Sequence, residues 1–375
     1  MARYHPPVHW LRAHPILGAL IVVGGALFGL LTFAVARPAA SFRDIASEQF
    51  TPDLAADQLA TPSPATVTTT TAPPAPDEHL PEVLRFRRAA EPDNLSGIQL
   101  AKLGSPVLPD ELFTSILLIG SDASGALADS IIYVLLPSDG SDPIMVSLPR
   151  DLWLPNRCTE GFTRINANLN GCGEAATGPE LLALAVENFT GISVDHYVRV
   201  SFAGFSNVID WMGGITICVN APTRDLKAHL DIPSGCNAAG GDTTLAWVRS
   251  RHTEQFVNGA WTAVGSSDFS RQTHQQDVLI QLARKLAAYR SPTSLAEALE
   301  RLSSAVRMDS GWSITQIASL GFRYRDLDTE SIVRLRLETE DYRTSGGAWV
   351  LLPKETFNRS LSRVFPEAAE ATEIG

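Results

Sequence analysis

The stretch SLPRDLWLP, residues 147–155, places an arginine and an aspartate directly after an apolar run typical of a buried strand. Pro149 ends the run, and Arg150 and Asp151 follow it. A charge at the end of a buried strand is costly unless an opposite charge contacts it, and strand ends in α/β sheets are where ligands bind. This pair therefore indicates either an anion site or an arginine neutralised by its own neighbour.

Two later stretches add cations and polar groups. Arg249 and Arg251 lie in AWVRSRHTE, near the end of an expected helix whose dipole they would also favour. In SDFSRQTHQQ, Asp268 can cap a helix on which Arg271 and Gln275 are one turn apart. Side chains there lean toward the helix N-terminus, where free N–H groups attract anions. A polar start of a surface helix is the simpler alternative.

Together these stretches contain four arginines, and a guanidinium binds phosphate with two parallel hydrogen bonds. They predict a pyrophosphate site. Asp122 follows a strand in GSD, and Asp129 begins the next strand in LADS. Mg²⁺ favours one or two carboxylates completed by water and phosphate oxygens, so both aspartates are candidate ligands of a Mg²⁺ cofactor. Ordinary capping of turns by aspartate is the alternative.

From about residue 110 the chain alternates β-branched runs with helical periods. The mixed order, with apolar side chains for both sheet faces, predicts one α/β domain over 110–366, a three-layer α/β/α sandwich with a mixed central sheet. A short tail, 367–375, follows it. The expected strands are Ser115–Ile119, Ser130–Leu136, Ile144–Leu148, His196–Val200, Ile215–Val219, Ser331–Leu337 and Ala348–Leu352. The expected helices are Glu180–Phe189, Phe202–Met212, Thr243–Ser250, Arg271–Tyr289, Leu295–Val306, Ile314–Leu320 and Glu355–Val364.

The N-terminal part predicts a single membrane anchor. Residues 16–36 carry no charge and are long enough to cross a bilayer as a helix. We expect residues 1–15 in the cytoplasm, a proline- and threonine-rich stalk with a lead-in over 37–109, and the folded domain outside the plasma membrane. A cleaved signal peptide is the alternative, because Ala34-Val35-Ala36 resembles a cleavage site.

The net charge of −11 argues against a general nucleic-acid binder. At the outer membrane face, the natural phosphate carrier is a glycan linked to a polyprenyl chain, which would also need an apolar groove. The four cysteines suit an exported domain. The nearest pairs, Cys158 with Cys172 and Cys218 with Cys236, are the favoured disulfides, with free thiols as the alternative; CxxC spacing typical of zinc sites is absent from the sequence.

The order of motifs resembles the LytR-CpsA-Psr family of bacterial cell-envelope proteins. The resemblance covers about 112–366 and is carried by GSD, SLPRD, RINAN, VENFTGISVDHYVRVSFAGF, DWMGGITICV, LAWVRSR and DFSRQTHQQ. It implies a phosphotransferase that moves a glycopolymer phosphate from a polyprenyl pyrophosphate carrier to a peptidoglycan sugar hydroxyl. A phosphohydrolase with the same site, or a non-catalytic envelope-binding protein, are the alternatives.

The resemblance also implies roles for single residues. Arg150, Arg249, Arg251, Arg271 and Gln275 match pyrophosphate-contacting positions. The two aspartates of GSD and LADS match Mg²⁺-associated ones. Asp268 matches the position expected to act as general base. Asp151 is expected to orient Arg150, the residue before it. All three residues and Arg271 are the catalytic candidates.

The sequence departs from the family pattern at three places. Leu127 stands where a phosphate-binding arginine is common, and His274 where a second one is frequent. Arg157 and Arg164 are nearby in sequence and are candidate substitutes. The stretch HTEQFVNGAWTAVGSS after VRSR is long, and we expect it to form a lid or to reshape the acceptor groove.

Overall fold

The computed structural model describes residues 47–48, 95–122, 124–159, 161–264, 268–287, 306–312 and 327–368. The expected membrane helix, most of the stalk, the last residues of the tail and the expected helix Ile314–Leu320 lie outside them, as does Leu295–Val306 apart from its final residue. Within the described ranges, none of the helices has the length and apolar composition required to cross a membrane.

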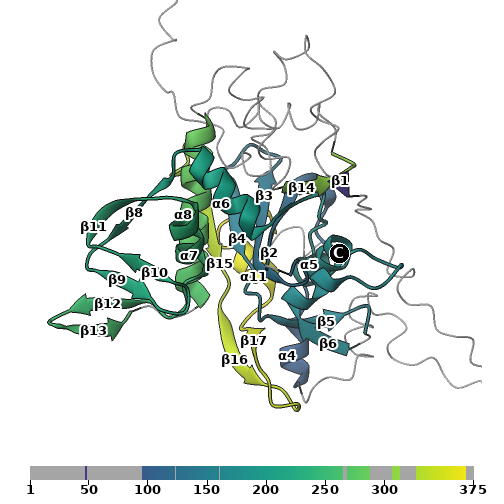
Figure 1. Cartoon of the computed structure of the whole chain (residues 1–375). Helices are drawn as coiled ribbons and strands as arrows, with labels where there is room; N and C mark the ends of the chain where they lie inside the picture. The colour runs from purple at the N-terminus through teal and green to yellow at the C-terminus, as the bar shows by residue number, and fades with distance from the viewer. Residues whose placement is uncertain are drawn as a thin grey trace, which may run out of the picture.

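A seven-stranded mixed sheet forms the centre of the fold (Figure 1). Its strand order is β1-β14-β7-β2-β3-β4-β15. Strand β2 pairs in parallel with β7 and antiparallel with β3, whereas the edge strand β15 pairs in parallel with β4. The strands are β1 (Ser47–Glu48), β2 (Phe113–Ser121), β3 (Ala128–Pro137), β4 (Ile144–Ser147), β7 (His196–Val200), β14 (Val306–Asp309) and β15 (Val333–Arg336).

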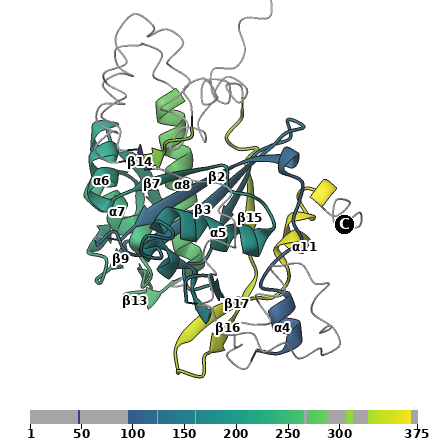
Figure 2. The same cartoon turned by 90° about the vertical axis from the view of Figure 1, so that its right-hand side faces the viewer.

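Helices cover both faces of this sheet, on opposite sides in the two views (Figures 1 and 2). Because side chains of a strand alternate between faces, Ile132 and Val134 of β3 join one core with α6, α7 and α8. Ile131 and Tyr133 join a second core with α5 and α11. The helices are α4 (Gly97–Ala101), η1 (Asp110–Leu112), η2 (Ile165–Asn170), α5 (Gly178–Thr190), α6 (Phe202–Trp211), α7 (Gly241–Arg249), α8 (Asp268–Ala287) and α11 (Phe357–Leu361).

This architecture agrees with the expected α/β fold and its mixed central sheet. Residues 95–109, assigned to the lead-in, already contribute Leu95, Leu103 and Leu108 to the second core. The expected strands at Ile215–Val219 and Ala348–Leu352 are present, but they pair in small sheets outside the central one. The smaller sheets contain β5 (Trp153–Asn156), β6 (Gly161–Arg164), β8 (Ile215–Val219), β9 (Thr223–Asp225), β10 (Leu230–Ile232), β11 (Gly235–Ala239), β12 (Glu254–Val257), β13 (Ala260–Ala263), β16 (Thr339–Arg343) and β17 (Trp349–Pro353).

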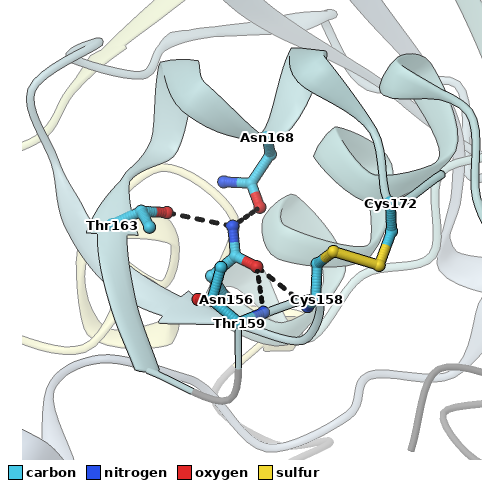
Figure 3. The surroundings of a disulfide bond; sticks show 6 residues. All are labelled: Asn156, Cys158, Thr159, Thr163, Asn168 and Cys172. Atoms are coloured by element: carbon cyan, nitrogen blue, oxygen red, sulfur yellow. Dashed lines mark hydrogen bonds between the residues drawn. A yellow bond between two sulfur atoms is a disulfide. The ribbon is translucent and has the colours of Figure 1, made fainter.

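Both predicted disulfides are present. Cys218 and Cys236 face each other across the β8–β11 pair. The bond between Cys158 and Cys172 closes the segment that contains β6 and η2. Beside it, the buried Asn156 side chain accepts hydrogen bonds from two backbone N–H groups at 2.8 and 3.1 Å and donates to Asn168 and Thr163 (Figure 3). The side-chain amide of Asn156 thus holds this loop together.

Helix α5 ends at a close backbone contact. Gly191 adopts a left-handed conformation with φ of 74°, which glycine reaches without steric cost. A Cβ at this position would lie 1.9 Å from the carbonyl oxygen of Pro106. The end of α5 and the segment before β2 can therefore pack together only if residue 191 lacks a side chain.

We predict that Gly191→Ala lowers the free energy of unfolding by more than about 3 kcal/mol, because steric overlap adds to the cost of a left-handed alanine. Gly173→Ala is the matched control, since Gly173 also has a positive φ (59°) but nothing lies within 4 Å of the added Cβ. It should cost about 1 kcal/mol. Urea unfolding of both variants measures the difference, and equal losses would contradict the packing argument.

Candidate functional site

The described residues enclose a cavity of about 230 Å³ between the central sheet and helices α6, α7 and α8. Its polar lining comes from strand ends and helix ends and consists of Asp129, Ser130, Arg150, Ser201, Arg249, Arg251, Arg271 and Gln275. Its apolar lining comes from positions further along the same elements and includes Leu118, Ile132, Val198, Phe205, Leu279 and Leu282. The cavity therefore offers a cationic part and an apolar part to a single ligand.

Helix α8 shows this division along one stripe. Arg271 and Gln275 lie in its first turns, and Leu279 and Leu282 follow on the same face. Arg271 is 4% exposed, and burial of a guanidinium is costly without an anion close by. The structure thus brings together all four arginines and the glutamine that the sequence singled out.

Arg150 reaches the cavity from the loop after β4. Its guanidinium forms an ion pair with Asp129 at the start of β3. Arg249 is the last residue of α7 and stacks on the ring of Phe202, with 4.6 Å between the guanidinium carbon and the ring centroid. These contacts fix two of the cations in place before any ligand binds.

Asp151 contacts three arginines. Its carboxylate lies 3.0 Å from Nε of Arg164 and 3.7 Å from both Arg150 and Arg251. Asp151 is absent from the cavity lining, so in this structure it acts on the site through the guanidinium groups that it holds. Its role as a catalytic residue stays a prediction.

Gln275 connects two elements at the cavity. Its side-chain oxygen accepts a hydrogen bond of 2.9 Å from Ser130, and its amide donates to the Val248 carbonyl at 3.2 Å. It therefore ties α8 to β3 and α7. Contact with a phosphate remains a prediction for this residue.

Asp122 belongs to the turn between β2 and β3. Its carboxylate accepts hydrogen bonds from the Ser124 hydroxyl at 2.8 Å and from the backbone of Leu127 at 3.2 Å. Desolvation acts to raise the pKa of Asp122, but these hydrogen bonds lower it below the ordinary carboxyl value. Asp122 does not line the cavity, whereas Asp129 does.

The donor set around these aspartates is small. Among the residues that the structure describes, no group of three or more His, Cys, Asp or Glu side chains lies close enough to hold a metal ion. A divalent cation at Asp129 and Asp122 would have to complete its shell with water and ligand phosphate oxygens. Mg²⁺ binds in that way, and Asp129 and Asp122 stay its candidate ligands as a prediction.

The remaining residues that the sequence suggested for the site lie in different surroundings. Asp268 begins α8, but its side chain lies outside the described residues. Leu127 is at the surface. Neither Arg157 nor Arg164 lines the cavity, and Arg164 instead contacts Asp151 and the Trp349 carbonyl. No substitute for the family's missing arginine is found at these two positions.

The long stretch after VRSR forms a β-hairpin in its described part. Strands β12 and β13 pair with each other, and β12 pairs with β9 to extend a four-stranded sheet. Phe256 and Trp261 are opposite each other in this hairpin, and Arg224 stacks on the Trp261 ring at 4.0 Å. The hairpin begins three residues after Arg251, so it restricts the course of the chain beside the cavity.

Sequence reasoning missed Asp225, which lies on β9 and is 1% exposed. One carboxylate oxygen accepts from the Ser250 hydroxyl and from the backbone N–H groups of Arg251 and His252, all at 2.8–2.9 Å. Desolvation would raise the pKa of Asp225, but these hydrogen bonds and one from Ala228 lower it to about 2. Asp225 thus fixes the backbone that carries one of the site arginines, and no local sequence pattern signals this contact.

His274 occupies the position where the family often has arginine. Its ring stacks on Trp247 with 3.6 Å between centroids, and its Nδ1 lies 3.3 Å from the Trp247 carbonyl oxygen. Burial lowers the pKa of His274 to about 4, although the contact with that carbonyl and the nearby Asp277 act in the opposite direction. At neutral pH the uncharged His274 ring therefore packs α8 against α7 and adds no positive charge to the site.

The LytR_cpsA_psr family model matches residues 107–363 of the chain. The chain is 35% identical over 134 residues to the probable cell wall biosynthesis protein LcpB of Corynebacterium glutamicum, covering 36% of this chain and 31% of LcpB. It is 29% identical over 216 residues to a Bacillus subtilis protein, the polyisoprenyl-teichoic acid–peptidoglycan teichoic acid transferase TagV, covering 55% of this chain and 51% of TagV. This chain thus spans about half or less of the length of these two curated relatives.

A solved structure shares the fold. The LytR-Csp2A-Psr enzyme from Actinomyces oris superposes with a TM-score of 0.55 at 24% identity, covering 69% of this chain and 96% of that one. At this level of identity the likeness concerns the architecture only. It agrees with the central mixed sheet and its helices described above.

We predict that Asp225→Asn lowers the free energy of unfolding by about 2–3 kcal/mol, because hydrogen bonds to a charged acceptor are lost. Asp231→Asn is the control, since Asp231 is exposed on the neighbouring strand β10. Thermal and urea unfolding at pH 7 measure both variants. An Asp225→Asn protein as stable as the control would show that the buried carboxylate does not hold this loop.

We predict that His274 makes the fold less stable in acid. Because its folded pKa lies below the unfolded value of about 6.5, the unfolded chain takes up a proton first, and stability falls as the pH drops from about 6.5 to 4. The loss reaches on the order of 3 kcal/mol at pH 4. His274→Phe keeps an aromatic ring on Trp247 and should remove this part of the pH dependence.

Unfolding measured from pH 7 to pH 4 compares that variant with His229→Asn. His229 is exposed and has a positive φ, which asparagine tolerates. This control should follow the parent chain. Parallel pH profiles of all three proteins would contradict the assignment.

Proposed function

The chain belongs to the LytR_cpsA_psr family, and on that premise we propose that it is a transferase of cell-envelope glycopolymers. In this proposal it moves a glycopolymer phosphate from a polyprenyl pyrophosphate carrier to a sugar hydroxyl of peptidoglycan. The similarity to TagV, named a polyisoprenyl-teichoic acid–peptidoglycan teichoic acid transferase, supports this class of donor and acceptor. The expected span at residues 16–36 would hold the domain at the outer face of the plasma membrane.

One observation carries the proposal most directly. A single cavity joins four arginines to an apolar lining, which is the pairing that a polyprenyl pyrophosphate requires. The guanidinium groups would bind the two phosphates, and the apolar side chains along β2, β3 and α8 would contact the isoprenoid chain. A water-soluble sugar phosphate would leave that apolar surface uncovered, and a simple lipid would leave the arginines without an anion.

The proposed reaction is a phosphoryl transfer. The acceptor oxygen attacks the phosphorus atom that carries the glycan, a new P–O bond forms, and the bond from that phosphorus to the bridging oxygen breaks. Polyprenyl phosphate leaves with the bridging oxygen and its electron pair. The carboxylate of Asp268 is the candidate acceptor of the hydroxyl proton.

The protein contributes mainly charge and position to such a reaction. Arg150, Arg249, Arg251 and Arg271 would offset the charge that builds up on the transferred group and on the leaving phosphate. Asp129 and Asp151 keep the guanidinium groups in place. Mg²⁺, held by Asp129 and Asp122 together with phosphate oxygens, would supply further neutralisation of charge.

We predict that Arg271→Ala and Arg249→Ala each reduce transfer about 10- to 100-fold, the effect of one lost hydrogen bond to a charged group. The assay uses the full-length protein in detergent, a polyprenyl pyrophosphate-linked glycan and peptidoglycan fragments. Its products are analysed by mass spectrometry for a phosphodiester link. Arg359→Gln, an exposed arginine on α11 outside the cavity, is the control and should keep full activity.

The products of the same assay distinguish a transferase from a phosphohydrolase. A glycan phosphate released into water, with no phosphodiester to peptidoglycan, would identify a phosphohydrolase. Arginine variants with unchanged transfer would contradict the assignment of the cavity as the donor site. Thermal unfolding of each variant shows whether the loss reflects chemistry or folding.

A further inference from the structure

A second cavity of about 180 Å³ lies between helix α8 and the strands β4 and β15. In contrast to the first cavity, all but one of its lining residues carry polar side chains. It consists of Ser147, Gln272, Thr273, Gln276, Arg334 and Arg336, together with Leu335. None of the sequence motifs assigns a role to this group as a whole.

The two cavities share one wall. Arg271 and Gln275 of α8 line the first cavity, and the residues that follow each of them, Gln272 and Gln276, line the second. Successive residues of a helix point about 100° apart, so the first turns of α8 present one stripe to each cavity. The end of β4 and the loop after it also contribute to both cavities. Ser147, the last residue of β4, lines the second cavity, and Arg150 in the loop lines the first.

Buried polar groups form the floor of the second cavity. The Gln276 amide donates to the Ser147 hydroxyl at 3.0 Å, and these two residues and Gln272 are buried. Burial of amides and hydroxyls is costly unless hydrogen bonds satisfy them. The hydrogen bond between Gln276 and Ser147 satisfies part of this need, and the amide and hydroxyl groups of these buried residues line the cavity.

The rim of this cavity carries exposed polar groups. Thr273 comes from α8, and Arg334 and Arg336 come from the edge strand β15, where they face α8. Arg334 forms an ion pair with Asp277 at 2.6 Å. Donors and acceptors thus reach this space from both α8 and β15.

We propose that this second cavity binds a sugar ring of the acceptor glycan, one that carries amide and carboxylate substituents. Hydroxyl, amide and guanidinium groups match the hydroxyls, acetamido groups and carboxylates of such a polymer, since a guanidinium binds carboxylate with paired hydrogen bonds. The inference rests on the proposed function. It adds the place from which the acceptor approaches, which is across the first turns of α8 from the lipid-binding part of the first cavity.

This placement suits the geometry of the transfer. The attacking and leaving oxygens of a phosphoryl transfer lie roughly in line on opposite sides of the phosphorus. With the leaving polyprenyl phosphate in the first cavity, the acceptor must come from another side of the arginine cluster. The second cavity adjoins that cluster through α8 and the SLPRD segment, and Asp268 begins the helix that separates the two.

The test uses Arg336→Gln and Thr273→Val, two exposed positions whose replacement leaves the buried floor intact. With the full-length protein and an uncrosslinked peptidoglycan tetrasaccharide as acceptor, we expect the KM for the tetrasaccharide to rise about 10-fold in Arg336→Gln, the effect of one lost charged hydrogen bond. The KM for the polyprenyl pyrophosphate-linked donor should change less than about twofold. Arg359→Gln again serves as the matched arginine control.

A binding measurement separates this inference from the proposed function. Calorimetric titration of the tetrasaccharide into donor-free protein should show binding in the parent chain and in Arg359→Gln, and weaker binding in Arg336→Gln. A parent protein that binds the tetrasaccharide but transfers nothing would overturn the proposed function and support the sugar site. Normal transfer with an unchanged acceptor KM in both cavity variants would overturn the sugar site alone.

Discussion

The structure depends on the convergence of four guanidinium groups in a chain whose net charge is −11. Like charges that line one cavity repel one another, and the repulsion grows as the surroundings become less polar. Asp129 and Asp151 offset part of this charge through direct contacts with the arginines. Among the described residues that line the first cavity, arginines outnumber carboxylates.

The fold meets this constraint by delivering each arginine from a different element end. Arg150 follows β4, Arg249 and Arg251 stand at the end of α7, and Arg271 lies in the first turns of α8. Their backbones are fixed by contacts that need no ligand, among them the buried carboxylate of Asp225 under the α7 terminus. The apolar side chains that follow along β2, β3 and α8 belong to the core on that face of the sheet. Part of the lining of the first cavity is thus an extension of the hydrophobic core.

Much of this arrangement was predictable from the sequence. The alternation of apolar residues predicted β2, β3, β4, β7 and β15 of the central sheet, and helical periods predicted α5 to α8, because both signals are local. Strands β1 and β14 were not predicted, and Val306 at the start of β14 was expected to end a helix. The convergence of the arginines was predictable because each follows a strand end or lies near a helix end. The disulfide pairs followed from short separations along the chain.

Other features could not be predicted, because they depend on contacts between distant segments. Asp225 has no local pattern that marks it, and its function arises only where β9 meets the end of α7. The polar cavity exists because β15 pairs with β4 and places Arg334 and Arg336 opposite α8.

The pattern of the disulfides has a consequence for how such a chain matures. Each bond joins cysteines that are neighbours among the four, and neither links the central sheet to another element of the fold. During synthesis from the N-terminus, the first pair is complete before the third cysteine emerges. Oxidation in this order would join the native partners directly, because each cysteine would be paired before a non-native partner is present.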